Sequence, residues 1–433
     1  MRKINTSPLS GMQELLPARQ AVFDKLKAGV AEAYRAHGFL NIETPMIDRT
    51  EILLSKAGGD TEKQIYKVIK TDEAKEEADQ ALRFDHTVPL ARYVVEHEND
   101  LAFPFHATQI GRNFRGERAQ KGRFREFYQC DVDVVGRGAL PIAYDAKVIA
   151  AIYDALQTFG LSDMKIRISN RKVLAGFLEA LGLSEKMTTI SSIIDHAEKI
   201  PREKTETRLR ELGIVEEDVV KITTFIDASG TANEVEKTLQ SVLGDLTAVE
   251  EGLGELKTVF ELLVGKGIGD NVVIDLMVVR GLDYYTGTVF ETILPKYKEI
   301  GSIAGGGRYD NLASSFTDQE LPGVGGSIGL TRLFCVLSEY GLLENGAEKN
   351  PVDYCLVPVS SNEYIYAMEL ANKLNAKGKS TDVAMMDKKL GDKLAYAAKV
   401  AQNAVVIGEE EMQTGELKVK DLITGDITSL ETE

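Results

Sequence analysis

An alternation of polar and apolar residues from Thr108 to Gly136 is the clearest pattern in the chain. At the two-residue period of a β-strand, each half of this stretch carries polar side chains on one face and apolar side chains on the other. The polar set consists of Gln109, Asn113, Arg115, Glu117, Arg123, Arg125, Gln129, Asp131 and Asp133. The segment between the halves, RAQKGR, is polar and contains a glycine, as a hairpin loop should. The pattern predicts a β-hairpin with its apolar face on a core and a polar face that is either solvated or the floor of a binding site.

Two helices and one further strand are expected before this hairpin. Apolar residues at helical spacing predict a helix from Pro17 to His37, and the alternating segment FLNIETPMID indicates a strand that ends at Pro45. In LRFDHTVPLARYVVEH, Pro89 stands where a helix could begin, with Asp85 and Thr87 just before it. These two side chains either cap that helix or contact a ligand, and the pattern leaves both open.

The middle of the chain changes character twice. A helix from Tyr144 to Gly160 and a strand KIRISN lead into a charged, helical segment from Arg171 to about Gly269, which we interpret as an insertion. The strand pattern then returns in VVIDLMVVRGLDYYTGTVFETIL and IAGGGRYDNL. Beside these apolar strands stand polar or amphipathic residues: Arg280, Asp283, Tyr284, Tyr285, Arg308 and Tyr309. Burying such groups without partners is costly, so they indicate a pocket.

The glycine-rich segment GVGGSIGLTRLFCVLSEYG predicts a strand of small residues that leaves room for a ligand, followed by a helix. Arg332 lies in the first turn of that helix. The segment differs in spacing from the dinucleotide-binding GxGxxG pattern, and no βαβ unit with a trailing acidic residue follows it.

A separate C-terminal domain is expected after the polar segment LLENGAEKNP. Its pattern alternates as β-α-β-α-β-β, which is typical of a compact α/β domain. Seven lysines crowd part of it: Lys373, Lys377, Lys379, Lys388, Lys389, Lys393 and Lys399. They form either a nucleic-acid contact or a solvated face.

Composition narrows the class of protein. With 433 residues, 43% hydrophobic and 27% charged, the chain is long enough for two or three globular domains. No apolar run approaches the roughly 20 residues that span a bilayer, and the N-terminus lacks a signal-peptide core. Three distant cysteines without a CxxC pair argue against disulfides and against a metal site, so we expect a cytoplasmic protein. A net charge of -16 argues against nonspecific nucleic-acid binding by the whole surface, though not against a local basic footprint.

Taken together, these segments resemble histidyl-tRNA synthetase, a class II aminoacyl-tRNA synthetase, over nearly the whole chain. GMQELLP is similar to the start of that family, and GFLNIETP resembles its first class motif. FRGERAQKGRFREFYQCDVDVVG resembles the second motif, and GSIGLTRL resembles the third. VVRGLDYYTGTVFE and GGGRYDNL resemble segments particular to the histidine enzyme.

The resemblance implies an α+β catalytic domain, with an antiparallel sheet flanked by helices and a helical insertion, and an α/β anticodon-binding domain. We place the catalytic domain at 1–170 and 270–341, the insertion at 171–269, a linker at 342–351 and the anticodon-binding domain at 352–433. The implied reaction activates L-histidine with ATP and Mg²⁺ to histidyl-adenylate, then transfers histidine to the 3′ end of tRNA(His). A homodimer built on the first motif is also implied.

The resemblance also implies residue roles. Arg280 and Arg115 would be catalytic at the α-phosphate. ATP would be bound by Arg115, Glu117, Arg123 and Arg332. The α-amino group of histidine would be bound by Asp85, Thr87 and Gln129. The remainder of the histidine molecule would be bound by Asp133, Arg280, Tyr284, Tyr285 and Tyr309. The tRNA-binding residues would be Gln120, Lys388 and Lys389.

Some positions depart from the pattern of the family. Asp85 and Asp133 stand where many relatives carry glutamate, Thr331 replaces a common acidic residue, and His86 stands where many relatives have glycine. None of these changes removes an arginine. The main alternative is a catalytically silent paralogue that acts as regulatory subunit of ATP phosphoribosyltransferase. The retained arginines and the C-terminal domain disfavour it. An enzyme for another amino acid or a non-tRNA acceptor is disfavoured by RGLDYYTG and the C-terminal lysines.

Overall fold

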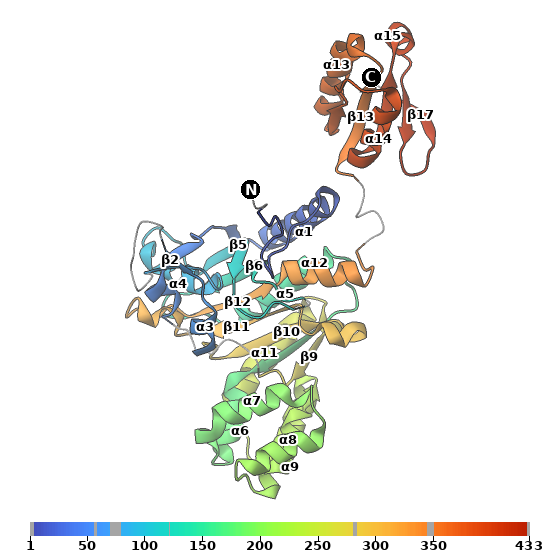
Figure 1. Cartoon of the computed structure of the whole chain (residues 1–433). Helices are drawn as coiled ribbons and strands as arrows, with labels where there is room; N and C mark the ends of the chain where they lie inside the picture. The colour runs from blue at the N-terminus through green and yellow to red at the C-terminus, as the bar shows by residue number, and fades with distance from the viewer. Residues whose placement is uncertain are drawn as a thin grey trace. The chain divides into compact units, whose positions relative to one another are not determined.

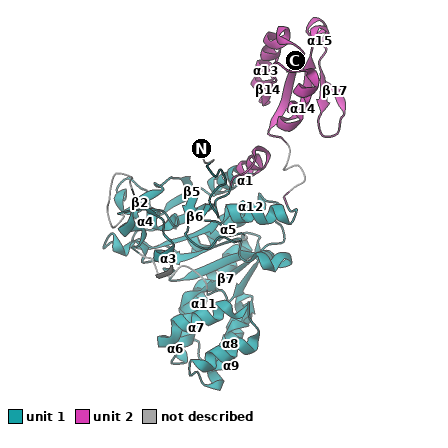
Figure 2. Cartoon of the chain, viewed as in Figure 1, with its two compact units in different colours: residues 1–13, 26–342 teal, residues 14–25, 343–433 magenta. Residues whose placement is uncertain are grey.

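The structure is a computed structural model that describes residues 4–55, 59–69, 79–120, 122–279, 284–343 and 350–430. The chain divides into two compact units, shown in Figure 2. The first unit contains residues 1–13 and 26–342, and the second contains residues 14–25 and 343–433. In the described part of the chain, no helix is long and apolar enough to cross a membrane.

The first unit is built on a mainly antiparallel sheet (Figure 1). The described strands follow the order β1-β5-β6-β12-β11-β10-β7-β9-β8, with only the β1–β5 and β7–β9 pairs parallel. Their bounds are β1 Leu40–Asn41, β5 Phe105–Phe114, β6 Glu126–Val135, β7 Lys165–Asn170, β8 Ser229–Gly230, β9 Val272–Asp275, β10 Thr288–Ile293, β11 Ala304–Tyr309 and β12 Gly323–Ile328. The expected antiparallel sheet is confirmed.

The hairpin that dominates the sequence pattern is formed by β5 and β6, which pair from Phe105–Val135 to Phe114–Glu126. The alternation holds along β6: Cys130, Val132 and Val134 are fully buried in the core. Their neighbours in sequence point to the opposite face of the sheet, as strand geometry requires. The predicted hairpin and its polar face are confirmed.

Helices cover the apolar face of this sheet. α5 contacts β6 and β12, α12 contacts β6, and α11 contacts β7 and β9. Among the described residues before 343 and outside 171–269, the α-helices are α1 Pro17–Ala36, α2 Thr50–Leu53, α3 Gly59–Gln64, α4 Thr87–Glu96, α5 Ala143–Gln157 and α12 Leu330–Glu339. From α1, the Tyr34 hydroxyl donates to the Cys130 carbonyl at 3.1 Å and so ties this helix to the hairpin.

The single strand expected to end at Pro45 is wrong. The segment splits into β1, which extends the large sheet, and β2 Ile47–Arg49, which joins β4 Gln80–Leu82 and β3 Lys67–Val68 in a small sheet. Thr44 lies at the break, and its carbonyl accepts a hydrogen bond from Arg83 Nη1 at 2.6 Å instead of from a strand partner. Pro45 has no N–H to donate to a ladder, so pairing stops here.

The segment from 171 to 269 is helical, as predicted. Its helices are α6 Arg171–Ala180, α7 Met187–Ala197, α8 Arg202–Glu211, α9 Glu216–Ile226, α10 Ala232–Leu243 and α11 Glu250–Gly265. It also contributes β8, which was not predicted. Buried Arg167 on β7 bonds to Asp275 and Glu291 at 2.8 Å and to Glu198 at 3.2 Å, so it ties the insertion to the sheet.

The second unit contains a five-stranded sheet with strand order β14-β13-β15-β16-β17. Its elements are β13 Val352–Pro358, α13 Tyr364–Ala376, β14 Thr381–Val383, α14 Leu390–Val400, β15 Ala401–Ile407, α15 Glu409–Thr414, β16 Lys418–Asp421 and β17 Ile427–Ser429. Leu356 packs against α13, and its neighbour Cys355 packs on the side of α14, so the two helices cover opposite faces. The predicted β-α-β-α-β-β order is confirmed, with α15 and β17 in addition.

Candidate active site

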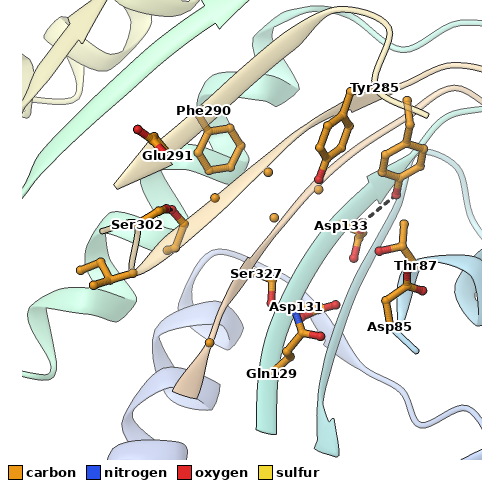
Figure 3. Close-up of a pocket in the computed structure, with 18 of the residues that line it drawn as sticks. Asp85, Thr87, Gln129, Asp131, Asp133, Tyr285, Phe290, Glu291, Ser302 and Ser327 are labelled. Carbon is orange, nitrogen blue, oxygen red and sulfur yellow. Dashed lines mark hydrogen bonds between the residues drawn. The ribbon is translucent and has the colours of Figure 1, made fainter. Parts of the chain in front are cut away.

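A cavity of about 610 Å³ lies on the polar face of the large sheet. This volume is within the range of small-molecule sites. Glycines of β11 and β12 belong to its lining, and Figure 3 shows polar side chains that also line it, among them Asp85, Asp131 and Asp133. The lining side chains with chemical function include Asp85, Thr87, Arg115, Gln129, Asp131, Asp133, Tyr284, Tyr285, Glu291, Tyr309, Ser327 and Arg332.

Asp133 and Tyr309 form a buried pair at one end of the cavity. The Tyr309 hydroxyl donates to Asp133 Oδ1 at 2.7 Å, and both residues are only 3% exposed. Burial raises the pKa of Asp133 well above its usual range, and the nearby Asp131 and Asp85 raise it further. Gly325 makes room for this carboxylate, because a Cβ there would lie 1.8 Å from Asp133 Oδ1.

Tyrosine rings close the same end of the cavity. Tyr284 packs edge-on against Tyr285 at 5.0 Å and against Tyr309 at 6.1 Å between ring centroids. Burial raises the pKa of each of the three phenols, so they remain protonated hydroxyl groups that can donate hydrogen bonds. Sequence alone placed these rings beside buried strands, and the structure brings them together.

Of the two roles that the sequence left open for Asp85, the structure shows helix capping, and ligand contact stays a prediction. Its Oδ1 accepts a hydrogen bond from the Val88 N–H at 3.1 Å, so it caps the start of α4, which begins at Thr87 and not at Pro89. Asp85 and Thr87 also line the cavity next to Asp133, as Figure 3 shows. Burial raises the pKa of Asp85, while the Val88 N–H and the charge of Arg115 oppose that shift.

Two arginines bring positive charge to the cavity. The Arg115 guanidinium lies over the rings of Phe84 at 4.3 Å and Phe127 at 5.1 Å, which hold it flat. Arg332 donates to the Ile300 carbonyl. The cavity therefore combines a cluster of carboxylates with two cations, an arrangement suited to a substrate that carries an ammonium group and a nucleotide that carries phosphates.

Comparison with known proteins identifies the family. A model of histidyl-tRNA synthetase matches residues 11–333, and a model of the anticodon binding domain matches residues 353–433. The chain belongs to the histidyl-tRNA synthetase family. It is 44% identical over 432 residues to a histidine–tRNA ligase of Clostridium tetani (strain Massachusetts / E88), covering 99% of this chain and 97% of the relative.

Solved structures agree with this assignment. The histidyl-tRNA synthetase of Nostoc sp. PCC 7120 superimposes with a TM-score of 0.88 at 36% identity, over 99% of this chain and 97% of the other. An ATP phosphoribosyltransferase regulatory subunit/histidyl-tRNA synthetase from Bacillus halodurans C has a TM-score of 0.77 at 22% identity, over 94% and 99%, and shows the fold alone. The class II synthetase fold predicted from the sequence is confirmed.

Several residues with roles implied by the synthetase resemblance lie away from the cavity wall. Glu117 and Arg123 form an ion pair at 3.3 Å near the tip of the hairpin. Gln120 lies in the same loop, where its carbonyl accepts from the Arg123 N–H at 2.8 Å. None of these three residues lines the cavity, so their nucleotide and tRNA roles stay predictions.

Arg280 lies outside the described residues. Val278 and Tyr284 on either side of it both line the cavity. In the second unit, Lys388 and Lys389 are exposed at the start of α14.

The seven lysines that crowd the C-terminal sequence differ in their surroundings. Lys393 is 2% exposed and donates to the Pro358 carbonyl at 2.8 Å, so it is structural. Lys373, on α13, and Lys399, on α14, belong to helices that cover opposite faces of the sheet. Lys373 and Lys399 therefore lie on different sides of the sheet, and a nucleic-acid contact by the lysines stays a prediction.

The sequence interpretation missed roles for four residues. Asp131, Ser327 and Glu291 line the cavity, and buried His86 contacts Asp131 from behind it. For Asp131 a signal existed, because it alternates with Gln129 and Asp133 along one strand face. Thr331, noted as a departure from the family, is 6% exposed, and its Oγ1 accepts from the Tyr128 N–H at 2.8 Å, which joins α12 to β6.

Proposed function

We propose that this chain is a histidine–tRNA ligase. It activates L-histidine with ATP to histidyl-adenylate, releasing diphosphate, and transfers histidine to the 3′ end of tRNA(His), releasing AMP. The observation that carries the proposal is the cavity, which has buried carboxylates and tyrosines at one end and the guanidinium groups of Arg115 and Arg332 among its lining. The family assignment supports the same reaction.

The carboxylate end suits histidine. Asp85, Thr87 and Gln129 offer oxygen acceptors to the α-ammonium group, and Asp133 and Tyr285 offer partners to the two ring nitrogens. A site built to hydrogen-bond both nitrogens leaves its own buried groups unpaired when an analogue lacks them, which costs the analogue about 10⁴–10⁵ in specificity. The Tyr309 hydroxyl holds the short Asp133 side chain in place, which supports this role for Asp133.

The arginines suit the first chemical step. A carboxylate oxygen of histidine attacks the α-phosphorus of ATP, and the bond to the β-phosphate oxygen breaks. Negative charge develops at the α-phosphate, where Arg115 is preorganised by Phe84 and Phe127 and where we place Arg280. We assign Arg332, together with Glu117 and Arg123, to the rest of the nucleotide.

Mg²⁺ enters this proposal as part of the nucleotide substrate. Among the described residues, no group of three or more His, Cys, Asp or Glu side chains could hold a metal ion. Mg²⁺ is commonly held by substrate phosphates with one or two carboxylates, so the phosphates of ATP would supply most ligands. It would neutralise charge on the departing diphosphate.

The second step uses tRNA. Attack of the terminal ribose hydroxyl on the carbonyl carbon of the adenylate breaks the bond to the phosphate and releases AMP. We assign Gln120 to the acceptor end and the exposed Lys388 and Lys389 to the second unit's contact with tRNA. We further propose a cytoplasmic homodimer built on the first motif. Exposed Leu40 (62%) in that motif and exposed Met46 (46%), which follows it directly, support an apolar contact there.

A charging assay tests the proposed function. Purified protein is incubated with ATP, Mg²⁺, labelled histidine and tRNA(His), and acid-precipitable label is counted. We expect charging that requires all four components. A regulatory paralogue would charge no tRNA. That alternative is not favoured, because both catalytic and anticodon-binding models match.

A further inference from the structure

Five polar side chains form a closed ring of close contacts behind the carboxylate end of the cavity. His86 Nδ1 lies 3.2 Å from Asp131 Oδ2, and Asp131 Oδ1 accepts from the Ser327 hydroxyl at 2.5 Å. Gln129 Nε2 donates to Ser327 Oγ at 2.9 Å, and Gln129 Oε1 accepts from Asn113 Nδ2 at 2.8 Å. Asn113 Nδ2 returns to within 3.4 Å of His86 Nδ1. The ring joins a buried histidine to a residue of the histidine subsite.

The directions of these hydrogen bonds follow from Asp131. The Ser327 hydroxyl donates its hydrogen to Asp131 Oδ1, so Ser327 Oγ is left to accept from Gln129 Nε2. Gln129 is thereby fixed with its nitrogen toward Ser327 and its oxygen toward Asn113. Its oxygen retains a second lone pair, which can accept from the α-ammonium group of a bound amino acid. If the Gln129 carboxamide were flipped, its N–H groups would face the Asn113 amide nitrogen and the ammonium group. Both of these are donors, so neither hydrogen bond could form.

His86 anchors this ring from a position that substrate does not reach. It is 0% exposed, it does not line the cavity, and its carbonyl accepts from Gln109 Nε2 at 3.2 Å. Its Nδ1 is closer to Asp131 than to Asn113, which assigns the Nδ1 hydrogen to the carboxylate. Gly111 leaves space for the ring, since a Cβ there would lie 3.1 Å from His86 Nε2. Within the described structure, that Nε2 has no hydrogen-bond partner.

We propose that His86 is a positioning residue of the amino-acid subsite. Through its Nδ1–H it holds Asp131, and through Asp131 and Ser327 it sets the orientation in which Gln129 presents an oxygen acceptor to the α-ammonium group. The inference rests on the proposed function, because it takes histidine as the occupant. It adds a determinant of amino-acid affinity that lies outside the cavity wall.

The test compares His86→Leu with His86→Asn. Leucine is of similar size but removes the donor, whereas asparagine Nδ2 takes nearly the place of Nδ1 and keeps it. In histidine-dependent pyrophosphate exchange, we expect His86→Leu to raise the KM for histidine about tenfold, the scale of one lost hydrogen bond to a charged group. We expect an unchanged KM for ATP, and restoration of the histidine KM to within about twofold in His86→Asn.

A double-mutant cycle tests whether the effect passes through the ring. Ser327→Ala alone should also raise the KM for histidine. In the double variant His86→Leu/Ser327→Ala, this KM should be little higher than in either single variant. Additive effects, an unchanged histidine KM in His86→Leu, or equal changes in both KM values without rescue by asparagine would overturn the inference.

Calorimetric titration with histidine separates the two proposals. Wild-type protein that binds histidine without exchange activity would refute the proposed function, while the same variants still test His86 through their dissociation constants. Wild-type protein that binds no histidine would overturn both.

Discussion

Replacing Asp133 with asparagine should make the protein more stable and less active. The carboxylate is 3% exposed, lies close to Asp131 and Asp85, and among the described residues receives a hydrogen bond from Tyr309. Asparagine keeps the size of the side chain and an oxygen for the Tyr309 hydroxyl, but it removes the buried charge. We therefore expect Asp133 to cost folding free energy and, in the proposed function, to contribute to histidine binding.

The sign and size of the effect follow from the pKa. Because burial raises the pKa of Asp133 in the folded state, the folded protein binds its proton more tightly than the unfolded chain does. The stability contribution of Asp133 is therefore fully present below its ordinary pKa of about 4, and it is lost as pH rises through the folded-state pKa. Each unit by which folding raises the pKa of Asp133 corresponds to about 1.4 kcal/mol of folding free energy at a pH above that pKa. We expect Asp133→Asn to be more stable than wild type by at least about 1 kcal/mol at pH 8, with a smaller gain at pH 5.

Urea unfolding at the two pH values measures the stability, and pyrophosphate exchange measures the activity. The exchange rate at low histidine concentration should fall about a hundredfold. The reason is that a neutral amide replaces the carboxyl group as the partner of the imidazole. The exposed residue Asp318 supplies the matched control, since Asp318→Asn should change neither quantity. A variant that is less stable than wild type at pH 8, or equally stabilised at both pH values, would refute the reasoning.

Two further changes test the glycine floor and the second unit. Gly325→Ala places a Cβ 1.8 Å from Asp133 Oδ1, so the carboxylate must move. In the exchange assay, the KM for histidine should rise at least about tenfold, and the KM for ATP should change little. An unchanged KM for histidine would contradict the role of Gly325 in making room for Asp133. Lys388→Ala/Lys389→Ala should weaken tRNA charging several-fold at physiological salt and leave exchange intact, because phosphate contacts act on tRNA alone. Alanine at exposed Lys418 is the control, and impaired exchange in the double variant would mean that the two lysines are structural.

Local sequence patterns were sufficient to predict the β5–β6 hairpin and the glycine-rich strand β12. The side-chain period of a strand is two, so the faces of β6 follow directly from the order of Gln129, Cys130, Asp131, Val132 and Asp133. The structure places the three polar residues in the cavity lining and the two apolar ones in the core. The sequence showed that Pro45 interrupts the first-motif strand, but it did not show that the carbonyl of Thr44 bonds to Arg83, which is distant in sequence.

The hydrogen-bonded ring could not be predicted from the sequence because it depends on which strands are neighbours. Asp131, on β6, is opposite Ser327 on the neighbouring strand β12 and opposite Gln109 on the other neighbouring strand, β5. These partners are separated by 196 residues in one case. His86 reaches the same point from the start of α4. Nothing in the local pattern brings the three elements together, and only the strand order does so.

The most direct test of the central claim is pyrophosphate exchange with each of the twenty amino acids in turn. In the proposed function, the cavity offers acceptors to an ammonium group and partners to both imidazole nitrogens, and two arginines lie in its lining. It therefore predicts ATP- and Mg²⁺-dependent exchange with L-histidine that exceeds every other amino acid by several orders of magnitude. No exchange with histidine, or comparable exchange with another amino acid, would contradict the account.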